Sequence, residues 1–441
     1  MSNKPDVNIF WFRRDLRLND NAGLYFSLKS EFPVLPLFIF DSNILSQLQN
    51  KKDPRVEFIY NSIIELRCKL EENGSRLMIE CGKPVDVFKK LIEDYNIHSV
   101  YTNHDYEPYA IDRDEKVSLL LIEHGISYVD FKDQVIFEKN EIIKDNGKPY
   151  TIYTPYSKKW KIKLNETSLE KYPSQTLLSN LFQTKPAKSF SLEEIGFTPT
   201  GFEFPPKTLK KEILGNYGAY RDFPFMDSTS RLSVHLRFGT ISIRDVVQKA
   251  MQHSEVWLNE LIWREFFMMI LYHFSYVVDK PFRPEYEYIQ WRNDENEFLL
   301  WCDGKTGYPL VDAGMRELHQ TGFMHNRVRM ITASFLTKHL LIDWRWGAQF
   351  FSENLIDYEL ASNNGNWQWA AGCGCDAVPY FRIFNPLIQQ KKFDPDLKYI
   401  KKWIPEYGTH EYPEPIVEHN FARERAINTY KTAISKFKNY Q

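Results

Sequence analysis

The segment Val34-Leu-Pro-Leu-Phe-Ile-Phe40 is a strand candidate, and a helical pattern follows it. In that pattern Val56, Ile59, Ile63, Leu66 and Leu70 recur at helical spacing, and Asn73-Gly74 can cap the helix. The alternation continues on both sides, with strands predicted at Val7–Phe12, Arg76–Glu80, Ser99–Asn103 and Ile126–Phe131, and a helix from about Pro108 to His124. Strand, helix and strand repeated in this way predict a parallel sheet covered by helices on both faces.

The rest of the chain loses this alternation. Prolines and polar stretches interrupt residues 136–215, which indicates a long linker with short structured pieces. Helical patterns dominate from about residue 216, and Leu258–Phe274 and Val328–Leu341 are predicted as buried helices. We therefore expect an α/β domain at 1–135, a linker at 136–215 and an all-helical domain at 216–441.

Composition excludes several classes of protein. The net charge of −2 and the pI of about 6.6 argue against a protein that coats long nucleic acids, but they leave room for a local basic patch. No G-x-G-x-x-G follows the first strand, and Gly304-Lys305-Thr306 lacks the rest of a phosphate-binding loop. An odd, sparse set of five cysteines suggests a reducing cytoplasm, and neither a metal site nor a membrane span is predicted.

Two polar clusters in the helical half have functional interpretations. Thr229-Ser230-Arg231-Leu232-Ser233 offers hydroxyls, backbone N–H groups and a guanidinium to a phosphate, although a plain helix N-cap would explain it too. Glu260, Trp263 and Arg264 share one helix face, so they could line a pocket for an extruded base. The alternative for this second cluster is an internal salt bridge beside a core tryptophan.

Two further clusters lie later in the chain. Asn326 and Met330 are neighbours on one helix turn, and Arg329 begins an apolar helix, so we expect it to have a buried acidic partner. The segment from Asp357 to Trp369 holds two acids, four amides at 363, 364, 366 and 368, and two tryptophans. Amide and carboxylate groups can hydrogen-bond a flavin ring, and a carboxylate can pair with Arg329.

These clusters give the sequence its resemblance to the photolyase/cryptochrome family over essentially the whole length, and it is most like class I cyclobutane pyrimidine dimer photolyases. The matching motifs occur in family order: Trp11–Asp20, Thr229–Ser233, Glu260–Phe267, Gly304–Pro309, Asn326–Met330, Asp357–Trp369 and Tyr380–Pro386. The resemblance implies a Rossmann-like antenna domain and a helical domain that binds flavin adenine dinucleotide (FAD).

The resemblance also implies roles around a U-shaped FAD. Tyr217 and the cluster Thr229, Ser230, Arg231, Leu232 and Ser233 would lie near the phosphates and ribose. Arg329, Asp357, Tyr358, Glu359 and Asn363 would surround the isoalloxazine ring, with Asn363 at N5. Glu359 stands where similar family members usually have Asp. Trp367, Trp344 and Trp291 match the electron-relay positions, for which simple packing is the alternative.

The implied reaction is light-driven repair of cyclobutane pyrimidine dimers. An electron passes from excited, reduced FAD to a dimer that has flipped out of UV-damaged DNA. The match assigns Glu260, Asn326 and Met330 to the dimer, Trp263 and Trp369 to the walls of its pocket, and Arg264, Asn326, Arg327, Arg382 and Gln389 to DNA. A (6-4) enzyme would carry a histidine near the position of Met330.

Two alternatives to repair and one open question accompany this interpretation. The chain could be a cryptochrome-type blue-light photoreceptor, or a non-catalytic nucleic-acid-binding protein with a vestigial flavin. A second antenna chromophore, a folate or a deazaflavin, is expected in the N-terminal domain. Glu107 resembles an acid that contacts folate in some relatives, but the accompanying basic residue is absent before Pro281. A cytoplasmic monomer is expected.

Overall fold

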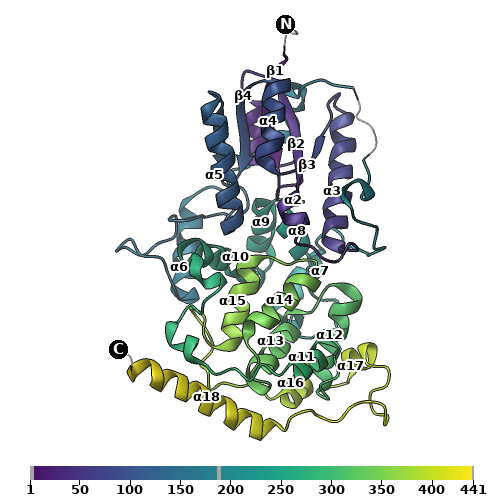
Figure 1. The fold of residues 1–441 in the computed structure, drawn as a ribbon, viewed down its shortest axis with the longest axis vertical. Coiled ribbons are helices and arrows are strands. Elements are labelled where there is room, and N and C mark those ends of the chain that lie inside the picture. The colour runs from purple at the N-terminus through teal and green to yellow at the C-terminus, as the bar shows by residue number, and fades with distance from the viewer. Residues whose placement is uncertain (1–3, 186–189, 440–441) are drawn as a thin grey trace. The chain divides into compact units, whose positions relative to one another are not determined.

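The computed structural model describes residues 4–185 and 190–439, and the chain folds into two compact units. The first unit comprises Met1–Glu141, Lys161–Thr208 and Arg231–Gln252, and the second comprises Ile142–Trp160, Leu209–Ser230 and His253–Gln441 (Figure 1). Neither unit is one consecutive stretch. The division into domains at 1–135, 136–215 and 216–441 stays a prediction.

The first unit contains a five-stranded parallel sheet in the order β3-β2-β1-β4-β5. Its strands are β1 (Asp6–Phe12), β2 (Val34–Asp41), β3 (Met78–Gly82), β4 (Asn96–Asn103) and β5 (Ser127–Phe131). Ile9 of β1 pairs with Leu35 on one side and Val100 on the other. The predicted α/β class and parallel sheet are confirmed.

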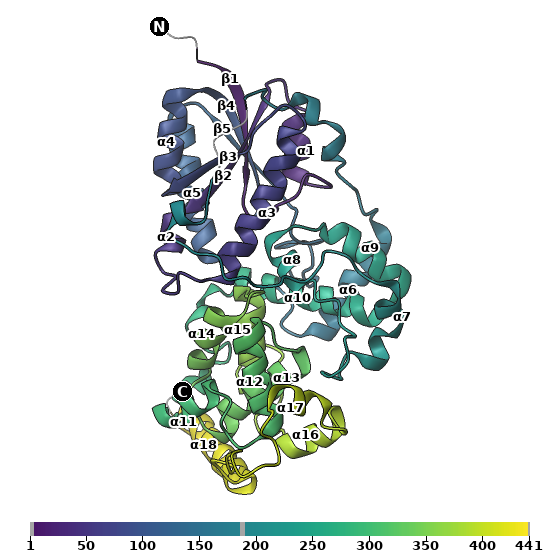
Figure 2. The ribbon, with the colours of Figure 1, turned by 90° about the vertical axis from the view of Figure 1, so that its right-hand side faces the viewer.

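Helices cover both faces of this sheet (Figure 2). The helices α1 (Ala22–Leu28) and α3 (Pro54–Glu71) share a buried core with Phe10 and Phe38, whereas α4 (Pro84–Asp94) and α5 (Pro108–Glu123) share another with Ile9 and Leu37. Successive residues of β1 and β2 thus enter opposite cores, which explains why these two strands are apolar on both faces. The short helix α2 (Ser42–Leu45) follows β2.

A buried ionic network joins the late segment of the first unit to its sheet. Arg244 lies on α9 (Ile243–His253), with its Nε 3.0 Å from the Asp20 carboxylate and its Nη2 2.7 Å from Asp133. Arg17 reaches the same Asp133 at 2.7 Å. The remaining short elements of this unit are α8 (Ser233–Phe238), η1 (Ser174–Thr176), η2 (Leu178–Asn180) and η3 (Glu193–Ile195).

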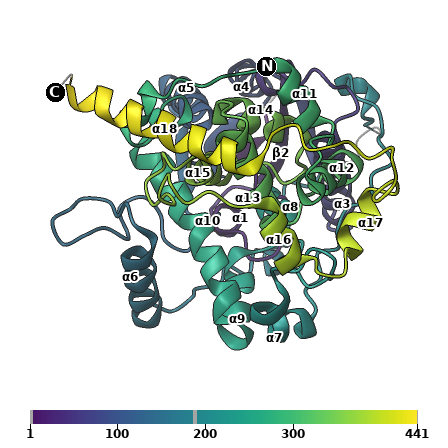
Figure 3. The same cartoon turned by 90° about the horizontal axis from the view of Figure 1, so that it is seen from below.

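Helices make up the second unit, in which the described residues form no named strand. They are α7 (Lys211–Tyr220), α10 (Glu255–His273), η4 (Ser275–Val278), η5 (Pro284–Tyr288), α11 (Glu295–Cys302), α12 (Pro309–Thr321), α13 (Asn326–Ser334), η6 (Phe335–His339), α14 (Trp344–Asn354), α15 (Leu360–Ala371), α16 (Pro386–Phe393), α17 (Lys398–Trp403) and α18 (His419–Asn439). The helix α6 (Tyr153–Glu166) begins in this unit. The long helix α18, yellow in Figure 3, packs on η5 and η6.

Several element boundaries differ from the prediction, among them those at 76–80 and 328–341. The strand expected at 76–80 begins two residues later, because its pairing with β2 starts at Leu37–Met78 while Ser75 bridges to Gln183. The helix expected at 328–341 begins at Asn326 and ends in a π-helical turn. There the Leu340 N–H reaches the Phe335 carbonyl at 3.2 Å, and the Thr337 hydroxyl bonds to the Ala333 carbonyl at 2.9 Å.

Candidate functional site

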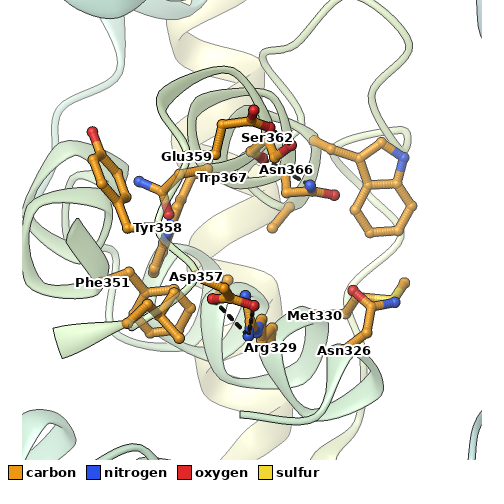
Figure 4. A pocket seen from close by; sticks show the side chains of 15 residues that line it. Asn326, Arg329, Met330, Phe351, Asp357, Tyr358, Glu359, Ser362, Asn366 and Trp367 are labelled. Carbon is orange, nitrogen blue, oxygen red and sulfur yellow. Dashed lines mark hydrogen bonds and ion pairs between the residues drawn. The ribbon is translucent and has the colours of Figure 1, made fainter. Parts of the chain in front are cut away.

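A cavity in the second unit is lined by residues of α13, α14, α15 and the loop before α15. Figure 4 shows Asn326 and Met330 at one end and Phe351 and Tyr358 at the other. Its volume is about 90 Å³. Pockets that enclose a whole ligand measure roughly 300–1,000 Å³, so this cavity would hold only one part of a dinucleotide. The lining combines apolar rings with an ion pair and amides, a donor set that suits the edge of a flavin ring.

An ion pair between Arg329 and Asp357 crosses the lining (Figure 4). The Arg329 Nη2 lies 2.9 Å from Asp357 Oδ2, and its Nε donates to the Met324 carbonyl at 2.7 Å. The Asp357 side chain is only 5% exposed, as the apolar helix around Arg329 predicts. The pair brings a fixed positive and a fixed negative group to one place in the cavity wall.

The N-terminus of α13 presents Asn326 and Met330. His325 caps this helix, because its Nδ1 accepts from the Arg327 N–H at 3.2 Å, and burial lowers the pKa of His325 to about 4. The neutral ring keeps its acceptor at physiological pH. Asn326 is exposed and one helical turn from Met330, so both can face a ligand from the same side.

The helix α15 contributes Asn363, Trp367 and Trp369. The Asn363 Nδ2 donates to the Ala348 carbonyl at 3.1 Å. The side-chain oxygen of Asn363 is therefore the atom that can accept a hydrogen bond from a ligand in the cavity. Glu359 stands at the N-cap position, where its carboxylate accepts from Ser362 at 2.6 Å and lies 3.7 Å from Arg264. These contacts hold the carboxylate of Glu359, at the position where the resemblance leads to the expectation of Asp.

The face of α10 carries Glu260 and Trp263. Arg221 forms an ion pair with Glu260, and its guanidinium lies 5.5 Å from the ring centroid of Tyr217. Trp263 stacks on Tyr153, with ring centroids 3.7 Å apart and planes 5° from parallel. Neither Arg221 nor Tyr153 was predicted as a partner from the sequence. Arg221 could have been found from its i+4 spacing to Tyr217, whereas Tyr153 lies in a stretch predicted to be a linker.

Thr229 and Ser230 belong to the second unit, and Arg231, Leu232 and Ser233 belong to the first. Arg231 adopts a φ of +49°, which non-glycine residues rarely do, and Leu232 is buried. The buried side chain leaves Leu232 only its backbone to offer to a ligand. The assignment of this cluster to a phosphate stays a prediction.

The three predicted relay tryptophans lie on segments that contact one another. Trp367 packs against Gly347 so closely that an added Cβ would lie 2.1 Å from its ring, and Trp344 is one turn before Gly347 on α14. The Arg292 N–H donates to the Leu341 carbonyl at 2.8 Å, and the Asp343 N–H to Asn293 Oδ1 at 2.9 Å. These bonds join the segments that carry Trp291 and Trp344.

The predicted DNA contacts vary in exposure. Arg327 forms an ion pair with Asp222 at 2.9 Å and lies 4.5 Å from the ring centroid of Phe393. Arg382 is exposed, and Gln389 is half-buried on α16. Arg264 is 12% exposed and close to Glu359. Nothing in the fold tests these DNA roles, which stay predictions.

Other predicted features have the following positions. Glu107, the folate candidate, lies in the first unit with its Oε1 3.0 Å from both Arg14 and Arg237. In residues 4–185 and 190–439 no three metal-ligand side chains are grouped, and no helix is both long and apolar enough to cross a membrane. Burial raises the pKa of Cys373 to about 12 and that of Cys375 to about 11.

Comparisons with known proteins cover both units. Residues 8–174 match a family model described as "DNA photolyase", and residues 257–410 match one described as "FAD binding domain of DNA photolyase". A deoxyribodipyrimidine photo-lyase from Halobacterium salinarum is 36% identical and covers 97% of this chain and 99% of the relative. The enzyme of that name from Synechococcus is 37% identical, with 97% and 98% covered.

Solved structures agree with these matches. A class III photolyase from Agrobacterium tumefaciens superposes with a TM-score of 0.85 at 33% identity, covering 98% of both chains. An archaeal photolyase from Sulfolobus tokodaii, described with two FAD molecules, has a TM-score of 0.79 at 32% identity and covers 97% of this chain and all of the other. A cryptochrome from Synechocystis has a TM-score of 0.84 at 26% identity, with the same coverage.

Proposed function

Because the chain belongs to the DNA photolyase family, we propose that it binds FAD and uses light to split cyclobutane pyrimidine dimers in UV-damaged DNA. One observation of the site carries this proposal. Three of the five residues assigned to the dimer and its pocket, Asn326, Met330 and Trp369, line the same cavity as the flavin residues Arg329, Asp357 and Asn363, whereas Glu260 and Trp263 do not line it. A dimer and a flavin held by these two sets would be neighbours.

The cofactor has a donor set that fits it. The Arg329–Asp357 pair would hold polar atoms of the ring, and the Asn363 carbonyl would accept from a ring N–H. When bound and reduced, FAD supplies the electron that blue light releases to the dimer. The apolar rings of Trp367 and Phe351 exclude water from the cofactor side of the cavity.

The lesion side of the site positions the dimer. A damaged pair stacks poorly in the duplex, so flipping it out costs less than flipping a normal pair. Trp263 and Trp369 offer aromatic faces to the flipped bases, and Asn326 supplies a hydrogen bond. Glu260 accepts from the dimer, and its partner Arg221 offsets the negative charge where the dimer gains an electron.

Light-driven repair is the test of this function. The purified protein, with its flavin reduced, is mixed with UV-irradiated oligothymidine, and dimer content is compared after blue light and after darkness. Dimer loss in the light alone is expected. No loss from a yellow protein that still photoreduces would instead favour the cryptochrome-type photoreceptor. A colourless protein would favour a nucleic-acid-binding protein with a vestigial flavin site.

Three further features remain predictions. The two FAD molecules described for the Sulfolobus tokodaii photolyase support a second, light-harvesting chromophore in this chain as well, of a chemical class still open between deazaflavin, folate and flavin. Extraction of the bound chromophores and their absorption spectra would identify it. A monomeric state and a cytoplasmic location are likewise proposed.

A further inference from the structure

Trp263 is held by an aromatic partner from a distant part of the chain. Tyr153, 110 positions earlier in the sequence, stacks on it with ring centroids 3.7 Å apart and an interplanar angle of 5°. A tryptophan on a helix surface otherwise samples several rotamers. A parallel ring at contact distance restricts the plane that the indole can adopt and covers one of its two faces.

Tyr153 is itself fixed at both ends. Its hydroxyl donates to the Asn259 carbonyl at 2.9 Å, and its backbone N–H donates to the Asp376 carboxylate at 2.9 Å. Burial, and then the negative charge of Glu260, raises the pKa of the Tyr153 hydroxyl, so it stays a donor. Tyr153 is therefore a rigid support for Trp263.

The rest of α6 fastens this support to α10. Tyr156 packs on Phe266 with centroids 5.2 Å apart, and the Trp160 Nε1 donates to Glu265 at 2.5 Å. Tyr153, Tyr156 and Trp160 are spaced by three and four residues, so one face of α6 makes all of these contacts. The support therefore comes from a packed helix.

A second chain of contacts ties Trp263 to α15. The ring centroids of Trp263 and Phe267 lie 5.4 Å apart. Phe267 in turn packs directly against Gly365 of α15, so closely that a Cβ added to this glycine would lie 2.1 Å from the phenyl ring. Gly365 is four residues before Trp369, which is the opposite wall of the proposed lesion pocket. The spacing between the two tryptophan walls is thus set by packed rings.

We infer that Tyr153 is a positioning residue for lesion binding, which rests on the function proposed above: it holds the indole of Trp263 ready to stack on a flipped pyrimidine. A wall that is already ordered loses little conformational entropy when the base arrives. Tyr153 is not among the residues that line the cavity with the proposed flavin and dimer residues. Its effect belongs to binding of the damaged site and not to electron transfer or bond cleavage.

Tyr153→Ala and Tyr153→Phe test the inference in the intact FAD-containing protein. In darkness, Tyr153→Ala is expected to bind a dimer-containing oligonucleotide about tenfold more weakly, because part of a stacking interaction is lost. Its quantum yield of repair at saturating substrate stays that of the wild type. Tyr153→Phe keeps the ring and restores the affinity, which separates stacking from the hydroxyl bond to Asn259.

Controls make the outcome decisive. Tyr276→Ala removes another tyrosine stacked on a phenylalanine in the same unit, and is expected to leave affinity unchanged. If Tyr153→Ala loses its FAD, Tyr153→Leu keeps an apolar side chain without a ring. Unchanged affinity in a folded variant, or tighter binding because Tyr153 covers the face that the lesion needs, would overturn the inference. A wild type without light-driven repair would instead defeat the proposed function.

Discussion

The carboxylate of Glu260 is held on α10 by the guanidinium of Arg221, and Arg221 in turn packs on Tyr217. Tyr217 lies on α7 and Arg221 is the C-cap residue of that helix, whereas Glu260 lies on α10. The helices α7 and α10 contact each other. A flipped dimer at Trp263, one turn along α10 from Glu260, would come within reach of this pair. The pair therefore places a hydrogen-bonding group and a compensating positive charge next to the proposed lesion.

Glu260→Ala is expected to lower the quantum yield of repair by roughly twofold or more, because a charge-assisted hydrogen bond to the dimer is lost. FAD content should stay that of the wild type. The measurement is dimers split per absorbed photon in the saturated complex. Glu255→Ala, in the first turn of the same helix, is the matched control and should repair normally. Full retention of yield in Glu260→Ala would remove Glu260 from the reaction.

Trp344→Phe is expected to stop light-driven reduction of oxidised FAD, because phenylalanine is not readily oxidised and the relay would end at Trp367. Repair by a chemically reduced sample should continue, since the relay serves the cofactor and not the lesion. Transient absorption of the flavin measures the rate of photoreduction, and counting the remaining dimers measures repair. Photoreduction at the wild-type rate would show that electrons leave Trp367 by another route, of which Trp301, 6.2 Å away between ring centroids, is one.

The sequence predicted single residues well where a local pattern required a partner. Arg329 at the start of an apolar helix needed a buried acid, and Asp357 is that acid. Tyr153 could not be foreseen, because its stacking on Trp263 depends on how two segments 110 residues apart pack. No periodicity in the sequence encodes such a contact.

At the scale of elements, the π-helical turn η6 after α13 places a lysine inside the second unit. Lys338 is fully buried, donates to the Ala371 carbonyl at 2.7 Å, and lies 3.7 Å from the ring centroid of Tyr430. Ala371 is the last residue of α15, so the amine meets the negative end of the helix that carries Trp367 and Trp369. Burial nevertheless lowers the pKa of Lys338 to about 7.

This lysine predicts how stability depends on pH. Between pH 7 and the ordinary lysine pKa of about 10.5, the unfolded chain binds more protons than the folded one, so the contribution of Lys338 to stability rises with pH. From pH 7 to pH 9 the gain is about 2 kcal/mol. Urea unfolding of the wild type and of Lys338→Met at both pH values measures it. An equal pH dependence in the two proteins would contradict the prediction.

Element types followed from the sequence, but some boundaries did not. The helix α10 was predicted from its apolar residues, and it begins three residues earlier, where the Ser254 hydroxyl accepts from the Trp257 N–H at 3.3 Å. A π-helical turn forms where a backbone N–H bonds to the carbonyl five residues earlier and not four. The hydroxyls of Thr332 and Thr337 bond to carbonyls four residues earlier and so compete with the backbone N–H groups for them. Apolar periodicity alone does not contain that choice.

At the scale of the whole molecule, the chain leaves and re-enters each compact unit. The sequence predicted three consecutive domains, because composition changes near 135 and 215. Asp20 and Arg244, 224 positions apart, form part of one buried network in the first unit. Such a long-range ion pair leaves no signal in composition, so residues 231–252 could not be assigned from composition to the unit with the sheet.

FAD is expected to stabilise the protein against unfolding, because it binds the folded chain and not the unfolded one. At a free concentration about a thousandfold above its Kd, the gain is about 4 kcal/mol. Urea unfolding of the apoprotein with and without added FAD measures this shift. NAD at the same concentration is the control, since the first strand is not followed by a nicotinamide-type dinucleotide motif. Equal shifts with both nucleotides would point to non-specific binding.

The tight packing around Trp367 limits which substitutions the gene can accept at Gly347. An added Cβ would lie 2.1 Å from the indole and 2.6 Å from a Leu336 methyl group, so even alanine has no room without movement of a buried ring. Every nucleotide change in a glycine codon that alters the amino acid introduces a Cβ or a stop. No one-step change of this codon that replaces the glycine is therefore expected to be tolerated, and neutral drift in this gene should leave glycine at position 347 while the surrounding surface diverges.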